Sequence, residues 1–172
     1  MPPRRPANAM ERAMRLLSAR AHTTSELRQK LLRAGFPPDE VGAAVEECER
    51  RHYLDDRMFA EDCTSLWLDR GHGARSIRNK LRQKGIPAEL ADAALDRSEE
   101  EEPAAACRAL ESKLPSLLRE KDPRKRRAKA LRFLAARGFA GTAIGAAMKR
   151  LAAAVDANGC DVDRDEATPE EW

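Results

Sequence analysis

The chain has 172 residues, 42% of them hydrophobic, and a formal net charge of +3. This length and apolar content are enough for a folded core and exclude a wholly disordered chain, while the small net charge excludes nucleic-acid binding through total charge alone. Ala, Leu, Arg, Glu and Lys are abundant and aromatic residues make up only 4%, a composition that favours helix almost throughout.

The first 35 residues predict two helices joined by a short turn. One covers residues 10–20, and the next begins at Thr23-x-x-Glu26, a capping box in which side chains satisfy the free backbone groups of a helix start. This second helix ends at Gly35, because glycine adopts the left-handed C-terminal turn without a Cβ clash. The apolar residues expected to face the core are Met10, Met14, Leu17, Leu27, Leu31 and Leu32.

A third helix follows, and the pattern then recurs twice. Pro37 and Pro38 stop the preceding segment and start the third helix. Gly35, Gly85 and Gly138 each follow a similar helical run and are 50 and 53 residues apart. The expected core continues with Val41, Ala44, Val45, Cys48, Phe59, Cys63, Leu66, Trp67, Cys107, Leu110, Leu114, Leu131, Leu134, Ile144, Met148 and Leu151.

The second and third copies each open with a longer helix. One is predicted over 56–70 and the other from Pro103, with an insertion at 115–123 that lengthens the link to the next helix. The sequence therefore predicts an all-α fold of three tandem three-helix, helix-turn-helix-like repeats stacked as an elongated curved rod. The predicted organisation is a flexible tail over 1–8, repeats over 9–54, 55–98 and 99–155, the last including an acidic linker, and a flexible acidic tail over 156–172.

Three stretches carry a family resemblance: SELRQKL over 25–31 with Gly35-Phe36, YLDD over 53–56 with Phe59-Ala60, and Arg70-Gly71 with IRNKL over 77–81 and Gly85-Ile86. In these stretches the chain is similar to the RecX family of bacterial regulators of the RecA recombinase. The resemblance implies a non-enzymatic protein that binds the RecA filament along its groove and limits filament growth, strand exchange and co-protease activity. It also implies weak binding to single-stranded and duplex DNA. Phe133, where the earlier copies have Lys30 and Lys80, leaves the contacts of the third repeat open.

Two segments are rich in cations. Residues 70–84 hold six basic and no acidic residues, and residues 119–137 hold nine basic residues and two acids. On a helix Arg75, Arg78 and Arg82 share a face opposite the apolar stripe, a geometry that suits a phosphate backbone or an acidic partner groove. The candidate binding residues are Arg28, Lys30, Arg75, Arg78, Lys80, Arg82, Lys84, Arg124, Lys125, Arg126, Arg127 and Lys129.

Other interpretations of these segments stay open. A cationic helix face is often only the solvated side of an amphipathic helix. Each glycine-containing helix pair also resembles a helix-turn-helix motif for duplex DNA, although PDE at 38–40 and PAE at 87–89 begin the following helices with acids that repel phosphate. A plain helical interaction scaffold is a further alternative, in which reversing Arg78 and Arg82 to Glu changes only solubility.

Two further features have both a structural and a functional interpretation. Residues 156–172 have a net charge of −6, and this tail is either solvated or folds over a basic face and competes with DNA. Phe59 and Trp67 fit a buried stripe better than a base-stacking surface, and the position of Tyr53 is undecided.

Catalytic and cofactor motifs are missing from the sequence. His22, His52 and His72 form no zinc-binding motif with the cysteines. The DVDRDE run over 161–166 resembles the opening of a calcium loop, but Glu166 replaces the required glycine. We therefore expect no enzyme activity, metal or cofactor. The lack of a CxxC pair, a signal segment and a long apolar run indicates a cytoplasmic protein outside the membrane, and we expect a monomer.

Overall fold

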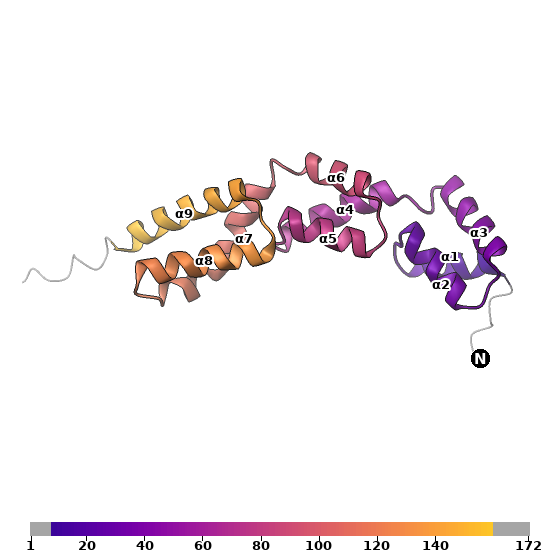
Figure 1. Cartoon of the computed structure of the whole chain (residues 1–172), viewed down its shortest axis with the longest axis horizontal. Helices are drawn as coiled ribbons and strands as arrows, with labels where there is room; N and C mark the ends of the chain where they lie inside the picture. Colours follow the sequence, from indigo (N-terminus) through magenta and orange to yellow (C-terminus); the bar gives the residue numbers. More distant parts are fainter. Residues whose placement is uncertain (1–7, 160–172) are drawn as a thin grey trace, which may run out of the picture. The chain divides into compact units, whose positions relative to one another are not determined.

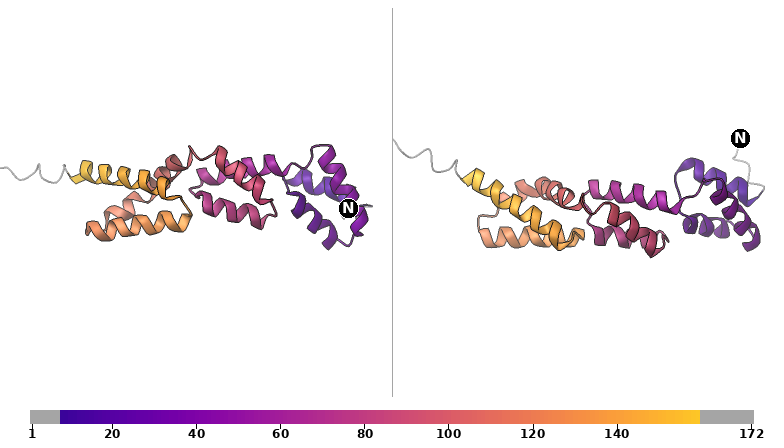
Figure 2. Two further views of the ribbon diagram at one scale, coloured as in Figure 1. Left: turned by 45° about the horizontal axis from the view of Figure 1, so that its top comes forward. Right: turned by 90° about the horizontal axis from the view of Figure 1, so that it is seen from above.

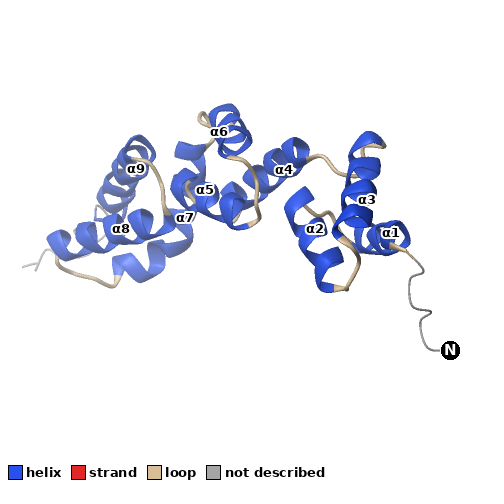
Figure 3. Cartoon of the chain, turned by 45° about the vertical axis from the view of Figure 1, so that its right-hand side comes forward, coloured by secondary structure: helices blue, strands red, loops and turns tan. Residues whose placement is uncertain are grey.

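The computed structural model describes residues 8–159, and over that range α-helices are the only regular secondary structure (Figure 1). Figure 3 shows short loops between them. The helices are α1 (Ala9–Ala19), α2 (Thr24–Arg33), α3 (Pro38–Arg50), α4 (Asp56–Asp69), α5 (Ala74–Gln83), α6 (Ala88–Arg97), α7 (Glu102–Leu118), α8 (Pro123–Arg137) and α9 (Gly141–Gly159). Their order in three groups of three confirms the predicted all-α class with tandem three-helix repeats.

Local signals in the sequence set the helix boundaries. Thr23 Oγ1 accepts a hydrogen bond from the Glu26 amide at 3.0 Å at the start of α2, and Asn8 and Asp122 cap α1 and α8 in the same manner. Each of these contacts satisfies a backbone donor that has no partner within the helix. The predicted glycine turns are confirmed by left-handed φ angles of 90° at Gly35, 78° at Gly85 and 82° at Gly138.

The chain divides into two compact units. One contains the residues up to Leu66 together with Arg78–Ser98, and the other contains Trp67–Ile77 and the residues from Glu99 onward, so α4 and α5 contribute to both. In the first unit α1, α2 and α3 pack against one another and confirm the stripe predicted for α3. The buried cluster there is Ala9, Ala13, Leu27, Leu31, Val41, Ala44, Val45, Cys48 and Leu54.

Several residues predicted in the core lie instead at the surface. Leu32 is 43% exposed although its neighbour Leu31 is fully buried, because consecutive residues are rotated by about 100° around a helix. The same correction applies to Met14, Leu66 and Leu131. Phe59, Cys63 and Trp67 are half-buried, and Tyr53 is exposed.

The third repeat differs from the prediction at Pro115. This residue lies inside α7, which continues to Leu118, so the proposed insertion over 115–123 does not begin there. A proline removes one backbone hydrogen bond, yet the helix persists because buried Leu110 and Leu117 hold it on both sides of the proline. Helix α7 packs closely against α9, and α8 and α9 lie side by side in both views of Figure 2.

The predicted tails fall mostly outside the described residues. Residues 1–7 and 160–172, together with Cys160 and the calcium-loop-like run over 161–166, belong to that part of the chain. Within the described range Asn8 is the N-cap of α1, and α9 extends to Gly159, beyond the predicted end of the third repeat at 155.

A carboxylate and a carbonyl from the second repeat hold the start of α2. Thr24 N donates to Asp56 Oδ1 at 2.8 Å, and Thr23 Oγ1 donates to the carbonyl of Lys84 at 2.7 Å. Burial raises the pKa of Asp56, although the hydrogen bonds from Thr24 oppose that shift. The second helix of the first repeat is therefore completed by groups from its neighbour.

The start of α5 is held in the same manner by the third repeat. Ala74 N donates to Glu102 Oε1 at 2.8 Å, and Gly73 N donates to the carbonyl of Arg137 at 2.9 Å. Glu102 Oε1 also accepts from Ala140 N, at 3.2 Å, beside the start of α9. Glu102 is only 6% exposed, so this end of the predicted acidic linker is buried in the fold.

Candidate functional site

Two predicted binding residues lie on α2 in the first unit. Arg28 is exposed, whereas Lys30 is half-buried and its Nζ lies 2.8 Å from His22 Nε2. His22 Nδ1 lies 2.9 Å from the carbonyl of Arg20. These partners require a neutral imidazole that donates from Nδ1 and accepts from the Lys30 ammonium at Nε2. Lys30 is therefore used within the fold, and Arg28 is the freer of the two cations.

Burial, helped by the charges of Arg20 and Lys30, lowers the pKa of His22 below its usual value of 6.5. In the unfolded chain the imidazole titrates near about 6.5. At His22 the unfolded state thus binds a proton more readily than the folded state. The stabilisation from neutral His22 is complete above the unfolded-state pKa and is lost as the pH falls through the folded-state pKa.

We therefore expect His22→Gln to destabilise the protein more at pH 7.5 than at pH 5.5. Gln cannot titrate, while Asp56 and the other titratable groups are common to both proteins and cancel in the comparison. Urea unfolding of both proteins at the two pH values measures the difference between their midpoints. A difference that is the same at both values would show that His22 is not held neutral in the folded state.

Most of the predicted cations on α5, together with Lys84 just after it, make contacts within the fold. Arg78 Nε forms an ion pair with Asp92 Oδ1 at 2.7 Å, and Lys84 Nζ forms one with Glu26 Oε1 at 2.7 Å. Although burial opposes it, the hydrogen bonds from Lys84 and Arg20 lower the pKa of Glu26. The Lys84 ammonium also lies 5.7 Å from the centre of the Phe59 ring, within cation–π range.

The other three α5 cations differ in exposure. Lys80 is half-buried and has an interaction partner. Arg75, in the second unit, is exposed, and its guanidinium reaches the carbonyl of Ala135 at 3.4 Å while its amide donates to the carbonyl of Gly138. Arg82 is exposed on the first unit. The α5 segment thus holds neighbouring elements in place, with Arg82 as its freest cation.

Helix α8 presents a different surface. It contains seven basic residues and no acid, and among the described residues none of its side chains forms an ion pair. Lys129 makes only a long contact of 3.4 Å to the carbonyl of Ser116, and Arg126 turns inward to donate to the carbonyl of Glu120 at 3.1 Å. The exposed cations, which we call the α8 face, are Arg124, Lys125, Arg127, Lys129 and Arg132.

Sequence reasoning missed two members of this surface. Arg132 follows Lys125 by seven residues and Lys129 by three, a helical spacing that places all three on one side. Leu131, predicted in the core, is 36% exposed, next to Arg132 in the chain. Phe133 lies instead beneath the Arg137 guanidinium, whose carbon is 5.2 Å from the ring centre. Phe133 stands where the earlier repeats have Lys30 and Lys80, but it is not part of the α8 face, so this difference leaves the α8 face unchanged.

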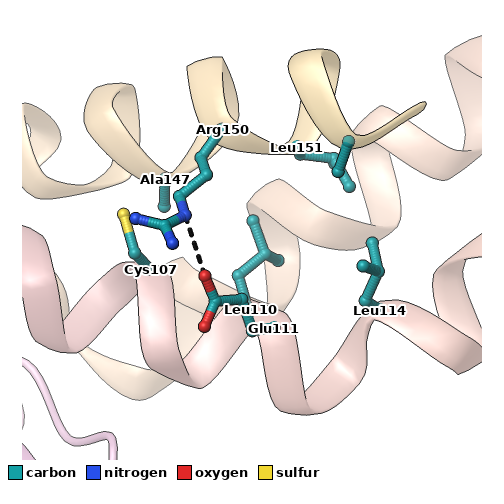
Figure 4. Close-up of a pocket in the computed structure, with 8 residues that line it drawn as sticks. Cys107, Leu110, Glu111, Leu114, Ala147, Arg150 and Leu151 are labelled. Carbon is teal, nitrogen blue, oxygen red and sulfur yellow. Dashed lines mark ion pairs between the residues drawn. The ribbon is translucent and has the colours of Figure 1, made fainter. Parts of the chain in front are cut away.

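An apolar groove of about 270 Å³ lies between α7 and α9. Figure 4 shows Arg150 on α9 reaching to Glu111 on α7, an ion pair of 2.8 Å, with Leu110 and Leu114 also on α7. The groove also contains Cys107 but no cluster of polar groups that converge on a ligand.

The remaining described residues offer little catalytic chemistry. Burial raises the pKa of the Cys48 and Cys63 thiols, which keeps both protonated and poorly nucleophilic. No group of His, Cys, Asp or Glu in the described range is arranged to hold a metal ion. Among the helices in that range, none has the length and apolarity needed to cross a bilayer.

The helix-turn-helix alternative finds little support in the third helices of the first two repeats. Asp39 and Glu40 occupy the first turn of α3, and Glu89 occupies that of α6. Glu40 Oε1 also accepts from Ala9 N at 2.6 Å, which ties the start of α3 to α1. A recognition helix reads base edges from its N-terminal end, where these carboxylates repel the phosphate backbone.

Comparisons with family models and with related proteins identify the same family, and a solved structure has the same fold. The models of the first, second and third three-helix domains of RecX match residues 9–48, 55–95 and 99–148. The regulatory protein RecX of Chlorobaculum tepidum is 36% identical over 135 residues, covering 77% of this chain and 81% of that protein. That of Chromohalobacter salexigens is 37% identical over 133 residues, covering 77% and 86%. The crystal structure of RecX from Lactobacillus salivarius has a TM-score of 0.77 at 20% identity, covers 84% of this chain and 95% of that one, and shows the same fold.

Proposed function

This chain belongs to the RecX family of regulatory proteins, and from that premise we propose that it regulates the RecA recombinase by binding the RecA–DNA filament. The bound protein limits filament growth, strand exchange and co-protease activity. It acts by occupying a surface, without turnover or a cofactor, as a cytoplasmic monomer. Family membership supports a regulatory role, and the charge distribution supports the mode of binding.

The observation that carries the mode of binding is the α8 face. Its five cations are exposed and have no carboxylate partner among the described residues, whereas Arg78 of α5 and Lys84, just after α5, are already paired. An unpaired cation binds a phosphate without first breaking an internal ion pair. We therefore place the principal contact with filament DNA on α8, with Arg28 and Arg82 as secondary contacts and the other candidate cations in structural roles.

The dimensions of α8 suit a phosphate backbone. Its 15 residues extend over about 22 Å at 1.5 Å per residue, which is about six phosphates at 3.4 Å spacing. Each neutralised phosphate releases counterions, so affinity falls steeply with salt. Such contacts bind without base preference, which fits a protein that acts on a filament assembled on any sequence.

Reversing three cations of the α8 face is expected to weaken binding to a single-stranded oligonucleotide by at least about 10-fold at 0.1 M salt. Loss of three phosphate contacts also lowers the salt slope by about 2, because each contact contributes about 0.7 on single strands. The variant is Arg124→Glu/Lys125→Glu/Arg127→Glu, measured by fluorescence anisotropy. The matched control is Arg33→Glu/Arg70→Glu/Lys149→Glu, which changes the net charge equally at exposed positions outside the proposed contacts. Equal losses in both proteins would mean that total charge, and not α8, governs DNA binding.

The regulatory role is tested on RecA itself. Substoichiometric amounts of the purified protein are expected to suppress the DNA-dependent ATPase and strand exchange of RecA on single-stranded DNA. The α8 variant, checked for folding by circular dichroism, is expected to suppress neither. If the wild-type protein leaves RecA unaffected and binds duplex DNA tightly with sequence preference, the filament proposal is wrong and the helix-turn-helix interpretation replaces it.

A further inference from the structure

A groove of about 210 Å³ separates the start of α8 from the second half of α9. The two helices are joined by the turn at Gly138 and pack against each other, so the end of α9 returns to the start of α8 (Figure 2). The N-terminal end of a helix also carries a partial positive charge, which adds to the cations already there. The lining residues are Pro123, Arg126, Arg127, Met148, Leu151, Ala152 and Val155.

The chain beyond α9 is the acidic segment at residues 160–172, with six acids and one arginine. Helix α9 ends at Gly159, four residues or about 6 Å beyond the groove residue Val155. Thirteen residues span at most about 43 Å, and α8 is about 22 Å long. The last described turns of α9 therefore lie near the most cationic end of α8, and thirteen further residues are enough chain to reach every cation of the α8 face.

We propose that residues 160–172 bind the α8 face within the same molecule and compete with nucleic acid for it. This inference rests on the proposed function only for the competition, since the intramolecular contact follows from charge and position. Single ion pairs in water are weak, but several carboxylates on a short tether act at an effective concentration in the millimolar range. The segment thus sets how much of the α8 face is available to DNA.

Salt weakens this contact, because charges at the surface are screened beyond about 8 Å at physiological ionic strength. The acidic segment therefore reduces DNA affinity most at low salt and least at high salt. With the acidic segment, the DNA affinity of the protein therefore depends less on salt than it would without the segment.

The test uses two full-length variants that change the net charge equally. Asp161→Asn/Asp163→Asn/Asp165→Asn removes three negative charges from the segment, and Glu99→Gln/Glu100→Gln/Glu101→Gln removes three from exposed positions before α7. We expect the first to bind a single-stranded oligonucleotide about 5-fold more tightly than wild type at 0.05 M salt and equally at 0.5 M. The second should differ from wild type by less than about 2-fold at both salt concentrations.

A readout without DNA separates this inference from the proposed function. In amide NMR spectra at low salt, the resonances of residues 124–132 are expected to shift in the first variant and not in the second. If they shift but neither variant changes DNA affinity, the intramolecular contact stands and the assignment of α8 as the DNA surface fails. If they do not shift, or if both variants raise affinity equally, residues 160–172 do not bind α8 and the inference is wrong.

Discussion

Replacing Gly73 with Ala is expected to lower the free energy of unfolding of the second unit by about 3 kcal/mol, the upper part of the usual range for overpacking. A Cβ at this position would overlap the backbone of Phe139 and Gly138. Relief requires the turn between α8 and α9 to move away from α5. That movement breaks the hydrogen bonds from Gly73 N to the Arg137 carbonyl and from Arg75 N to the Gly138 carbonyl.

Thermal unfolding followed by circular dichroism measures the Gly73→Ala effect, and the melting temperature should fall by about 10 °C. The control is Gly145→Ala in α9, where an added Cβ meets nothing within 4 Å. It is expected to stabilise the protein by about 1 kcal/mol, because Ala has a higher helix propensity than Gly. If Gly73→Ala has the same melting temperature as the wild-type protein, close backbone packing at this turn is ruled out.

Replacing Glu102 with Ala is the second change with a large expected effect, about 3 kcal/mol. It removes the acceptor shared by Ala74 N and Ala140 N, and leaves two partly buried donors without that partner beside the starts of α5 and α9. It also removes a negative charge from the positive ends of those helices. Urea unfolding of the full-length protein measures the loss of stability.

Two neighbouring variants show whether the geometry at Glu102 is responsible. Glu102→Gln keeps an acceptor oxygen and should lose about half as much stability as Glu102→Ala. Glu101→Ala removes an exposed carboxylate with no capping hydrogen bond and should change stability by less than about 0.5 kcal/mol. Equal effects of Glu101→Ala and Glu102→Ala would indicate that only the overall charge of the acidic run matters.

The helices could be predicted closely because their boundaries depend on nearby residues. Thr23, Gly35 and Pro38 act within one turn of the helix ends that they define. Pro115 was misjudged for the opposite reason, since the burial of Leu117 against other elements keeps α7 intact and has no local signature. Local sequence thus predicts helix ends well and predicts poorly where packing overrides a helix breaker.

The candidate site was predicted only in part. The sign of the charge on α5 was clear, but Arg78 meets Asp92 and Lys84 meets Glu26 through tertiary packing that a count of charges does not contain. Helix α8 was easier, because a helix without acids cannot pair its cations internally. A signal for Glu102 was present in the sequence, since Asp56 begins the first helix of the preceding repeat in the same manner.

The hydrogen bonds that link the start of a helix to the following repeat form in a defined order during synthesis. As the protein is synthesised from its N-terminus, the first turn of α2 lacks its carboxylate until Asp56 emerges, and that of α5 lacks one until Glu102 emerges 28 residues after Ala74. Helix α8 needs no later residue, because Asp122, immediately before it, accepts from the amides of Arg124 and Lys125. The starts of α2 and α5 thus gain their last hydrogen-bond acceptor only after part of the following repeat has been synthesised.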